Sequence, residues 1–130
     1  MANPNIVSVS SIYGECVGWN LTTGLTTTLF TVASEKLVKI NRIVCANVDG
    51  TNAADLDLLI TTSVQTSSGG TVASGATTIY LAKTISVPAD ASLVVSDTPI
   101  YLREGDILKG GASAASDLDL FISYEVLDDA

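Results

Sequence analysis

The sequence lacks histidine altogether and has only two cysteines in a chain of 130 residues. Histidine is the side chain most often used for proton transfer near neutral pH, so its absence excludes histidine-dependent catalytic triads. Cys16 and Cys45 lack the C-x-x-C spacing of redox pairs and of many zinc sites. The Gly-rich phosphate-binding motifs of nucleotide enzymes are missing too. These absences predict a protein that is not an enzyme and that binds no cofactor.

Basic residues are also scarce in this chain. Six Lys and Arg stand against 14 Asp and Glu, which gives a net charge of −8. The field of such a protein repels phosphate backbones and anionic headgroups, so neither nucleic acid nor a membrane is an expected partner. Lys36, Lys39 and Arg42 lie close in sequence but fall on two faces of a strand, which favours solvated or ion-paired side chains over a basic patch.

Long hydrophobic runs are absent, and residues 1–11 lack the basic and apolar regions of a secretion signal. No transmembrane span is therefore expected, and the protein is expected to be made in a reducing cytoplasm. In that setting Cys16 and Cys45 are expected to pack as small apolar side chains. A disulfide between them stays open, because sequence spacing alone does not decide pairing.

Alternation of apolar and polar residues is what the sequence has in abundance. Hydrophobic residues make up 47% of the chain and charged residues 15%, and the length fits one domain with one core. The segment 53–60, Ala-Ala-Asp-Leu-Asp-Leu-Leu-Ile, returns as 114–122, Ala-Ala-Ser-Asp-Leu-Asp-Leu-Phe-Ile. Leucines at every second residue, with aspartates between them, predict two strands with one buried and one solvent-exposed face each.

The same alternation with a period of two recurs along the chain and predicts a series of short strands. We predict an all-β protein, an antiparallel β-sandwich or jelly roll with about eight to ten short strands, with a closed barrel as the second choice. An N-terminal arm over residues 1–11 is expected to precede a single domain over 12–130. The strands are expected over Ile6–Ser10, Ile12–Trp19, Thr26–Val32, Leu37–Val48, Asp55–Val64, Thr77–Val87, Ala91–Val95, Pro99–Leu102, Ile107–Lys109 and Asp117–Val126.

Turn residues predict how these strands are connected. Asp49-Gly50 tolerates positive φ and predicts a tight hairpin between Leu37–Val48 and Asp55–Val64. Arg42 interrupts the alternation and indicates either a bulged strand or an exposed bend. Residues 65–75 are polar and Gly-rich, which predicts a projecting loop. Gly110-Gly111 is expected to break the ladder before the last strand.

Carboxylates are the remaining candidates for a site. Asp55 and Asp57 share one strand face, as do Asp117 and Asp119, and two such pairs on adjacent strands would suit calcium. The competing interpretation is that these aspartates lie on solvent-exposed strand faces and only keep the protein soluble. A hydrolase based on them is disfavoured, because no general base with a tuned environment is evident. Trp19 and the four tyrosines are expected to anchor the core with their polar atoms at the rim.

Several turn-and-strand segments resemble one group of proteins. They are Val87-Pro88-Ala89, Leu93-Val94, the turn Leu102-Arg103-Glu104-Gly105-Asp106, the final-strand segments Asp117-Leu118 and Ser123-Tyr124-Glu125, and the mid-chain segment Ala46–Asn52. These segments are similar to those of small virion proteins of tailed bacteriophages, most closely of marine and cyanobacterial hosts. The resemblance implies a structural part of the virion and no enzymatic reaction.

The resemblance leaves head decoration, neck and tail-fibre roles open, and our first hypothesis is a head decoration or cement subunit. We expect a homo-oligomer, a trimer, that binds the major capsid protein or the neck and tail proteins on the outside of the virion. The N-terminal arm, through Asn3, Pro4, Asn5 and Ile6, is expected to dock on a neighbour. The alternative is a neck, tail-fibre or spike module that recognises a host glycan or protein through the 65–75 loop, at Ser67, Ser68, Gly69 and Gly70.

Overall fold

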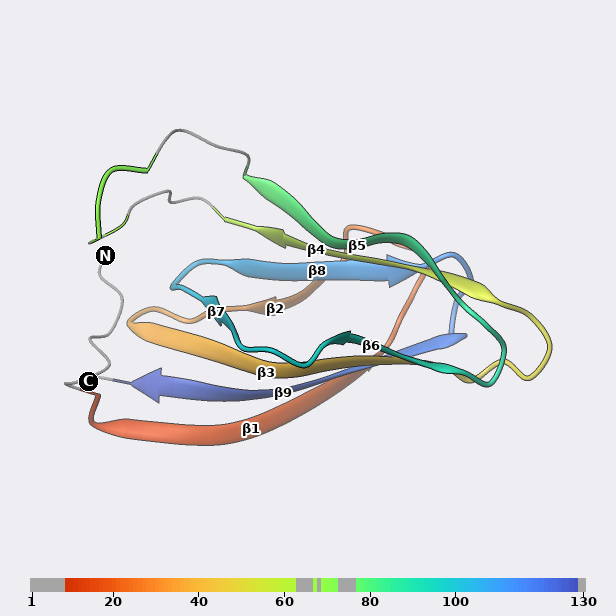
Figure 1. Ribbon diagram of the computed structural model, residues 1–130, viewed down its shortest axis with the longest axis horizontal. Helices are drawn as coiled ribbons and strands as arrows, with labels where there is room; N and C mark the ends of the chain where they lie inside the picture. Colours follow the sequence, from red (N-terminus) through yellow and green to blue (C-terminus); the bar gives the residue numbers. More distant parts are fainter. Residues whose placement is uncertain (1–8, 63–66, 68, 73–76, 129–130) are drawn as a thin grey trace.

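The computed structural model describes residues 9–62, 67, 69–72 and 77–128, and within these ranges the chain forms nine strands and no helix (Figure 1). This confirms the all-β class and the predicted number of strands. No helix with the length and hydrophobicity to cross a bilayer occurs in these ranges. The strands are β1 (Ser11–Asn20), β2 (Thr28–Thr31), β3 (Lys36–Asn47), β4 (Ala54–Thr61), β5 (Thr78–Val87), β6 (Ser92–Ser96), β7 (Ile100–Leu102), β8 (Ile107–Ala112) and β9 (Leu118–Asp128).

The strands form two antiparallel sheets packed as a sandwich. Sheet A has the order β1-β9-β3-β6, with β7 also paired to β3, and sheet B has the order β2-β8-β4-β5 (Figure 1). Every ladder joins a strand before residue 62 to a strand after residue 77. The nested pairs β1–β9, β2–β8 and β4–β5 are those of one long hairpin folded over itself, which is the jelly-roll arrangement.

The core lies between the two sheets and includes leucines from both copies of the repeated segment. Leu56 and Leu58 in β4, and Leu118 and Leu120 in β9, are at most 1% exposed. Because β4 and β9 are interior strands of opposite sheets, the two copies supply the two sides of one core.

The prediction of one wet face for each copy is wrong for β4. Asp57 and Leu59 point away from the core but are only 5% and 2% exposed. Leu59 lies between Tyr80 of β5 and Lys109 of β8 in the register of sheet B, so longer neighbouring side chains flank it. The second copy keeps its wet face, and Phe121, which corresponds to Leu59, is 47% exposed.

The hairpin expected at Asp49-Gly50 is also wrong, although the turn exists. The N–H of Thr51 donates to the Asp49 carboxylate at 2.8 Å, and this contact, with the amide of Asn52, holds the pKa of Asp49 below its usual value. However, β3 pairs with β6, β7 and β9, whereas β4 pairs with β5 and β8. Residues 48–53 therefore carry the chain from sheet A to sheet B, and no ladder joins the strands they connect.

Two further expectations concern strand continuity. The register of β3 against β9 shifts between Ile40 and Arg42, so the bulged-strand interpretation is confirmed. Gly110 and Gly111 do not break the ladder, since both lie inside β8. They are needed for a close approach: a Cβ on Gly111 would lie 2.6 Å from the carbonyl oxygen of Gly24 and 2.8 Å from the Cα of Leu25. The 22–27 segment lies against β8 at this point, where the Gly110 N–H donates to Thr27 at 3.0 Å.

We predict that Gly111→Ala lowers the free energy of unfolding by about 1–3 kcal/mol. The added methyl group would overlap backbone atoms of residues 24 and 25, which cannot move aside by a change of side-chain rotamer. Chemical denaturation followed by circular dichroism measures the change. Gly14→Ala is the matched control, because a Cβ at Gly14 meets no atom within 4 Å. Equal stability of the two variants would contradict this account of β8.

Candidate functional site

The four candidate calcium ligands are divided between the two sheets. Asp55 and Asp57 lie on β4 of sheet B, whereas Asp119 lies on β9 of sheet A and Asp117 immediately precedes it. The expectation that the two pairs occupy adjacent strands is therefore wrong. No group of three or more Asp, Glu or Cys side chains in the described ranges is arranged to hold a metal ion.

Asp57 has a clear structural contact. Its Oδ1 accepts a hydrogen bond from the N–H of Thr84 at 2.7 Å. Thr84 has a φ of 53°, which is unusual for a β-branched residue, and it lies where the register between β4 and β5 shifts. A bulge of this kind leaves a strand N–H without its ladder partner, and the carboxylate supplies the acceptor. Asp57 thus stabilises the bulge in β5 by accepting the hydrogen bond from the Thr84 N–H.

The expected arm and loop contacts lie largely outside the described residues. Asn3, Pro4, Asn5, Ile6 and Ser68 are among the residues that the structure does not describe, as is most of the strand expected over Ile6–Ser10. Ser67, Gly69 and Gly70 are described and exposed, and the Gly69 N–H donates to the Ser67 hydroxyl at 3.0 Å.

Aromatic side chains depart most from expectation. Tyr124 is buried and contacts Phe30 edge-on, with ring centroids 5.1 Å apart. In contrast, Tyr13, Tyr80 and Tyr101 are between 41% and 52% exposed, so the predicted core role is wrong for these three. Tyr80 and Tyr101 pair in register with Leu59 and Lys39 and lie on the outer faces of the two sheets, whereas Tyr13 lies on the inner face of the rim strand β1.

The outer face of sheet A carries a row of apolar side chains. Phe121 on β9 pairs in register with Val44 on β3, and Val44 pairs with Val94 on β6. Phe121 and Val94 are 47% and 44% exposed. The next residues of this face are polar, and the Lys39 Nζ lies 3.8 Å from the Glu125 carboxylate. The row is therefore an apolar strip beside charged neighbours, a composition typical of contact surfaces.

One end of this row borders an open depression of about 410 Å³, which is lined by Gly18, Trp19, Asn20, Asp119, Leu120 and Phe121. The Asn20 amide donates to the Asp119 carboxylate within it. A glycosidase needs two carboxyl groups on either side of the scissile bond, and Asp119 is the only one in the lining. The depression offers two aromatic side chains, Trp19 and Phe121, and an amide–carboxylate pair for contact.

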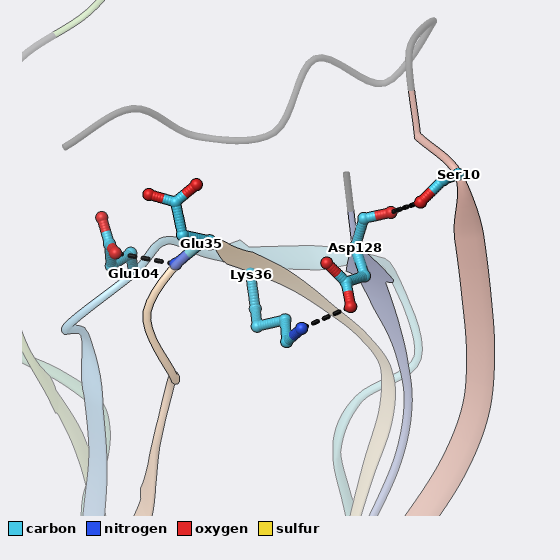
Figure 2. Close-up of polar contacts among 5 residues, drawn as sticks. All are labelled: Ser10, Glu35, Lys36, Glu104 and Asp128. Atoms are coloured by element: carbon cyan, nitrogen blue, oxygen red, sulfur yellow. Dashed lines mark hydrogen bonds and ion pairs between the residues drawn. The ribbon is translucent and has the colours of Figure 1, made fainter. Parts of the chain in front are cut away.

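Polar contacts tie together the opposite end of sheet A, where β1 begins and β9 ends (Figure 2). Lys36 of β3 forms an ion pair with Asp128 of β9, and the Ser10 hydroxyl donates to the Asp128 carbonyl oxygen at 3.0 Å. Glu104 accepts from the N–H of Glu35 at 2.7 Å. The Ser10 contact holds the segment before β1 against β9, the ion pair joins β3 to β9, and the Glu104 contact joins the segments that precede β3 and β8.

The two cysteines are both free, so no disulfide joins them. Cys45 is fully buried as expected, and burial, assisted by Asp119, raises the pKa of its thiol to about 11. Cys16 is exposed on β1, and the expectation that it packs as an apolar side chain is wrong. The reason is that Cys16 pairs in register with Ser123 on the outer face of sheet A, which none of the described strands covers.

Comparison with protein-family models, with curated proteins and with solved structures found no match for this chain.

Sequence reasoning missed the surfaces just described, although one signal was available. Phe121 stands at the position that Leu59 has in the first copy of the repeated segment, on the side opposite the core leucines. An aromatic residue at a position predicted to face water indicates a contact surface.

We predict that Asp57→Ala lowers the free energy of unfolding by about 1–3 kcal/mol, since the Thr84 N–H loses its acceptor. Asp57→Asn, which keeps an oxygen at the same place, should retain most of the stability. Thermal unfolding of both variants with and without calcium checks this. A calcium-dependent rise in Tm that disappears in Asp57→Asn would restore the metal interpretation.

We also predict that a thiol reagent at pH 8 modifies Cys16 rapidly and Cys45 only after unfolding. With a pKa of about 11, the buried Cys45 thiol is protonated at that pH and therefore weakly nucleophilic. Peptide mass spectrometry after timed quenching measures both rates. Equal rates in the native protein would show that β3 does not shield Cys45.

Proposed function

We propose that this protein is a non-enzymatic structural subunit of a tailed-phage virion, an outer head decoration or cement protein that acts as a homo-oligomer. The observation that carries the proposal is the apolar row Phe121–Val44–Val94 on the outer face of sheet A, whose two end residues are exposed. A side chain such as Phe121 at 47% exposure gains free energy when another surface covers it. The apolar row is therefore suited to binding another protein surface.

Charge supports an external position. The net charge of −8 disfavours contact with packaged DNA. The fold is compatible as well, because jelly rolls occur in viral capsid proteins, but they also occur in lectins and cupins. The architecture alone therefore carries no function, and the resemblance of the turn and strand segments supplies the link to virions.

Copy number on the particle tests this role. Quantitative mass spectrometry of purified virions should find the protein in hundreds of copies, because decoration subunits cover a repeating lattice. A few copies per particle would favour the alternative, a neck, fibre or spike module that binds a host glycan or protein through the exposed segment at Ser67 and Gly69–Val72. Absence from the particle would contradict both roles.

The expected arm gives a second test. We predict that deletion of residues 1–6 weakens attachment to the particle while the domain stays folded, because β1 begins only at Ser11. Occupancy on reconstituted particles and the circular dichroism spectrum are the two measurements. Unchanged occupancy of the shortened protein would count against the arm. The trimer stays a prediction, which the mass of the protein in solution tests.

A further inference from the structure

We propose that the free side of β1 pairs with β1 of a second copy of this chain, antiparallel and about a two-fold axis at Cys16. The contact joins two copies of sheet A into one continuous sheet. This inference rests on the geometry of β1 alone and does not require the virion role.

The first observation is that β1 is a long and regular edge strand. It has ten residues, it stands at the end of the strand order of sheet A, and its ladder with β9 has no register shift. Figure 1 shows β1 along the rim of the sandwich, and none of the nine described strands lies beyond it. An edge of this kind is a ready template for another strand.

The backbone groups that face outward can be assigned. Leu21, directly after β1, donates its N–H to the Leu118 carbonyl oxygen at 2.9 Å and continues the register of Asn20 with Asp119. Along an unbulged antiparallel ladder, residues alternate between pointing toward the partner strand and pointing away. The even-numbered residues of β1 therefore present their N–H and C=O groups to the free side: Ile12, Gly14, Cys16, Gly18 and Asn20.

The other rims of the sandwich carry several features that protect edges, whereas β1 carries only one charged side chain, Glu15. In sheet B, β2 has four residues and a register shift, and β5 has two register shifts and Lys83 beside the positive-φ residue Thr84. The far rim of sheet A is divided between β6 and β7, with Pro99 between them. Short strands, bulges, Lys and Pro all discourage edge pairing. The sequence of β1 contains neither Lys nor Pro.

The sequence of β1 indicates that the strand that pairs with its free side is β1 of a second copy. Residues 13–19 read Tyr-Gly-Glu-Cys-Val-Gly-Trp, which is nearly symmetric about Cys16. In an isologous antiparallel contact, residue i meets residue j and j meets i. A two-fold axis at Cys16 places Gly14 opposite Gly18 of the second copy, and Tyr13 opposite Trp19. This register matches aromatic with aromatic and glycine with glycine.

Neighbouring registers are less favourable. A two-fold axis at Glu15 would set two carboxylates directly opposite each other, which is destabilising. With the axis at Cys16, Glu15 lies opposite Val17 of the second copy. Glu15 also pairs in register with Tyr124, whose pKa is raised by burial and then by this carboxylate, so the charge lies on the inner side of the strand.

Within the described residues, space for the second copy is available on both faces of β1. Tyr13 points to the inner side of sheet A yet is 52% exposed, so β1 overhangs sheet B at that point. On the outer side, Gly14, Cys16 and Gly18 are small and uncharged. Antiparallel pairing of the outward groups would form about ten backbone hydrogen bonds and cover Tyr13 with Trp19 of the second copy.

The experiment begins with the full chain in solution. We predict that light scattering coupled to size exclusion gives twice the chain mass at high concentration and that the mass falls on dilution. A short bis-maleimide should join two chains through Cys16, because the Cα atoms of such a pair lie about 5.5 Å apart. The Cys16→Ala variant should keep the doubled mass and lose the cross-link.

Cys16→Pro is the decisive variant. It removes an N–H that faces the second copy and leaves the bonds to β9 in place, the setting in which edge strands tolerate proline. We expect a monomeric mass with an unchanged circular dichroism spectrum. Tyr13→Glu repeats the test without a backbone change, should proline prevent folding. Trp19 is the only tryptophan, so its emission should shift on dilution of the wild type and stay constant in both variants.

A monomeric mass at all concentrations would overturn the proposal. So would a trimer that survives Cys16→Pro and Tyr13→Glu, which would leave the virion role intact. Loss of the doubled mass on deletion of residues 1–6 would assign the β1 edge to the arm of a neighbour and would also contradict the symmetric contact. Conversely, a confirmed two-fold contact in a protein absent from virions would refute only the virion role.

Discussion

The pairing of each strand from the first half of the chain with strands from the second half is the constraint on which the structure depends. All seven strand ladders have this form, and the four ladders of sheet A all include β3 or β9, the two central strands of that sheet. Ile40 and Ile43 on β3, and Leu120 and Ile122 on β9, are at most 1% exposed and hold this pair in the core. The same topology leaves β1 at a rim, because β9 is the only described strand with which β1 pairs.

Strands were predictable from the sequence because alternation is a local property. A run such as Ala54–Thr61 shows its period of two without reference to its neighbours, and nine strands fall close to the expected ranges. Which strands pair was not predictable, because partners lie far apart in sequence. Asp49-Gly50 illustrates the limit: the residues specify a turn, but the turn alone does not decide whether the chain returns to the same sheet or crosses to the other.

The candidate site was harder to predict for a related reason. Exposure depends on whether an opposite layer covers a side chain, so Tyr13 and Tyr124 look alike in sequence but differ in burial, at 52% and 8% exposed. Asp57 was assigned to a wet face, and only the bulge at Thr84 shows why it is buried. The near-symmetry of residues 13–19 is visible in the sequence, but it indicates a two-fold contact only once β1 is known to be an edge strand.

The nested pairing also affects how the chain is made. Residues leave the ribosome in order, so β1 to β4 emerge before any strand with which they pair in the finished molecule. Contacts of such long sequence separation form slowly, because a large loop must close first. The newly made first half therefore waits with its leucines uncovered, and a brief association with a chaperone would protect it until β9 arrives to complete the sheet.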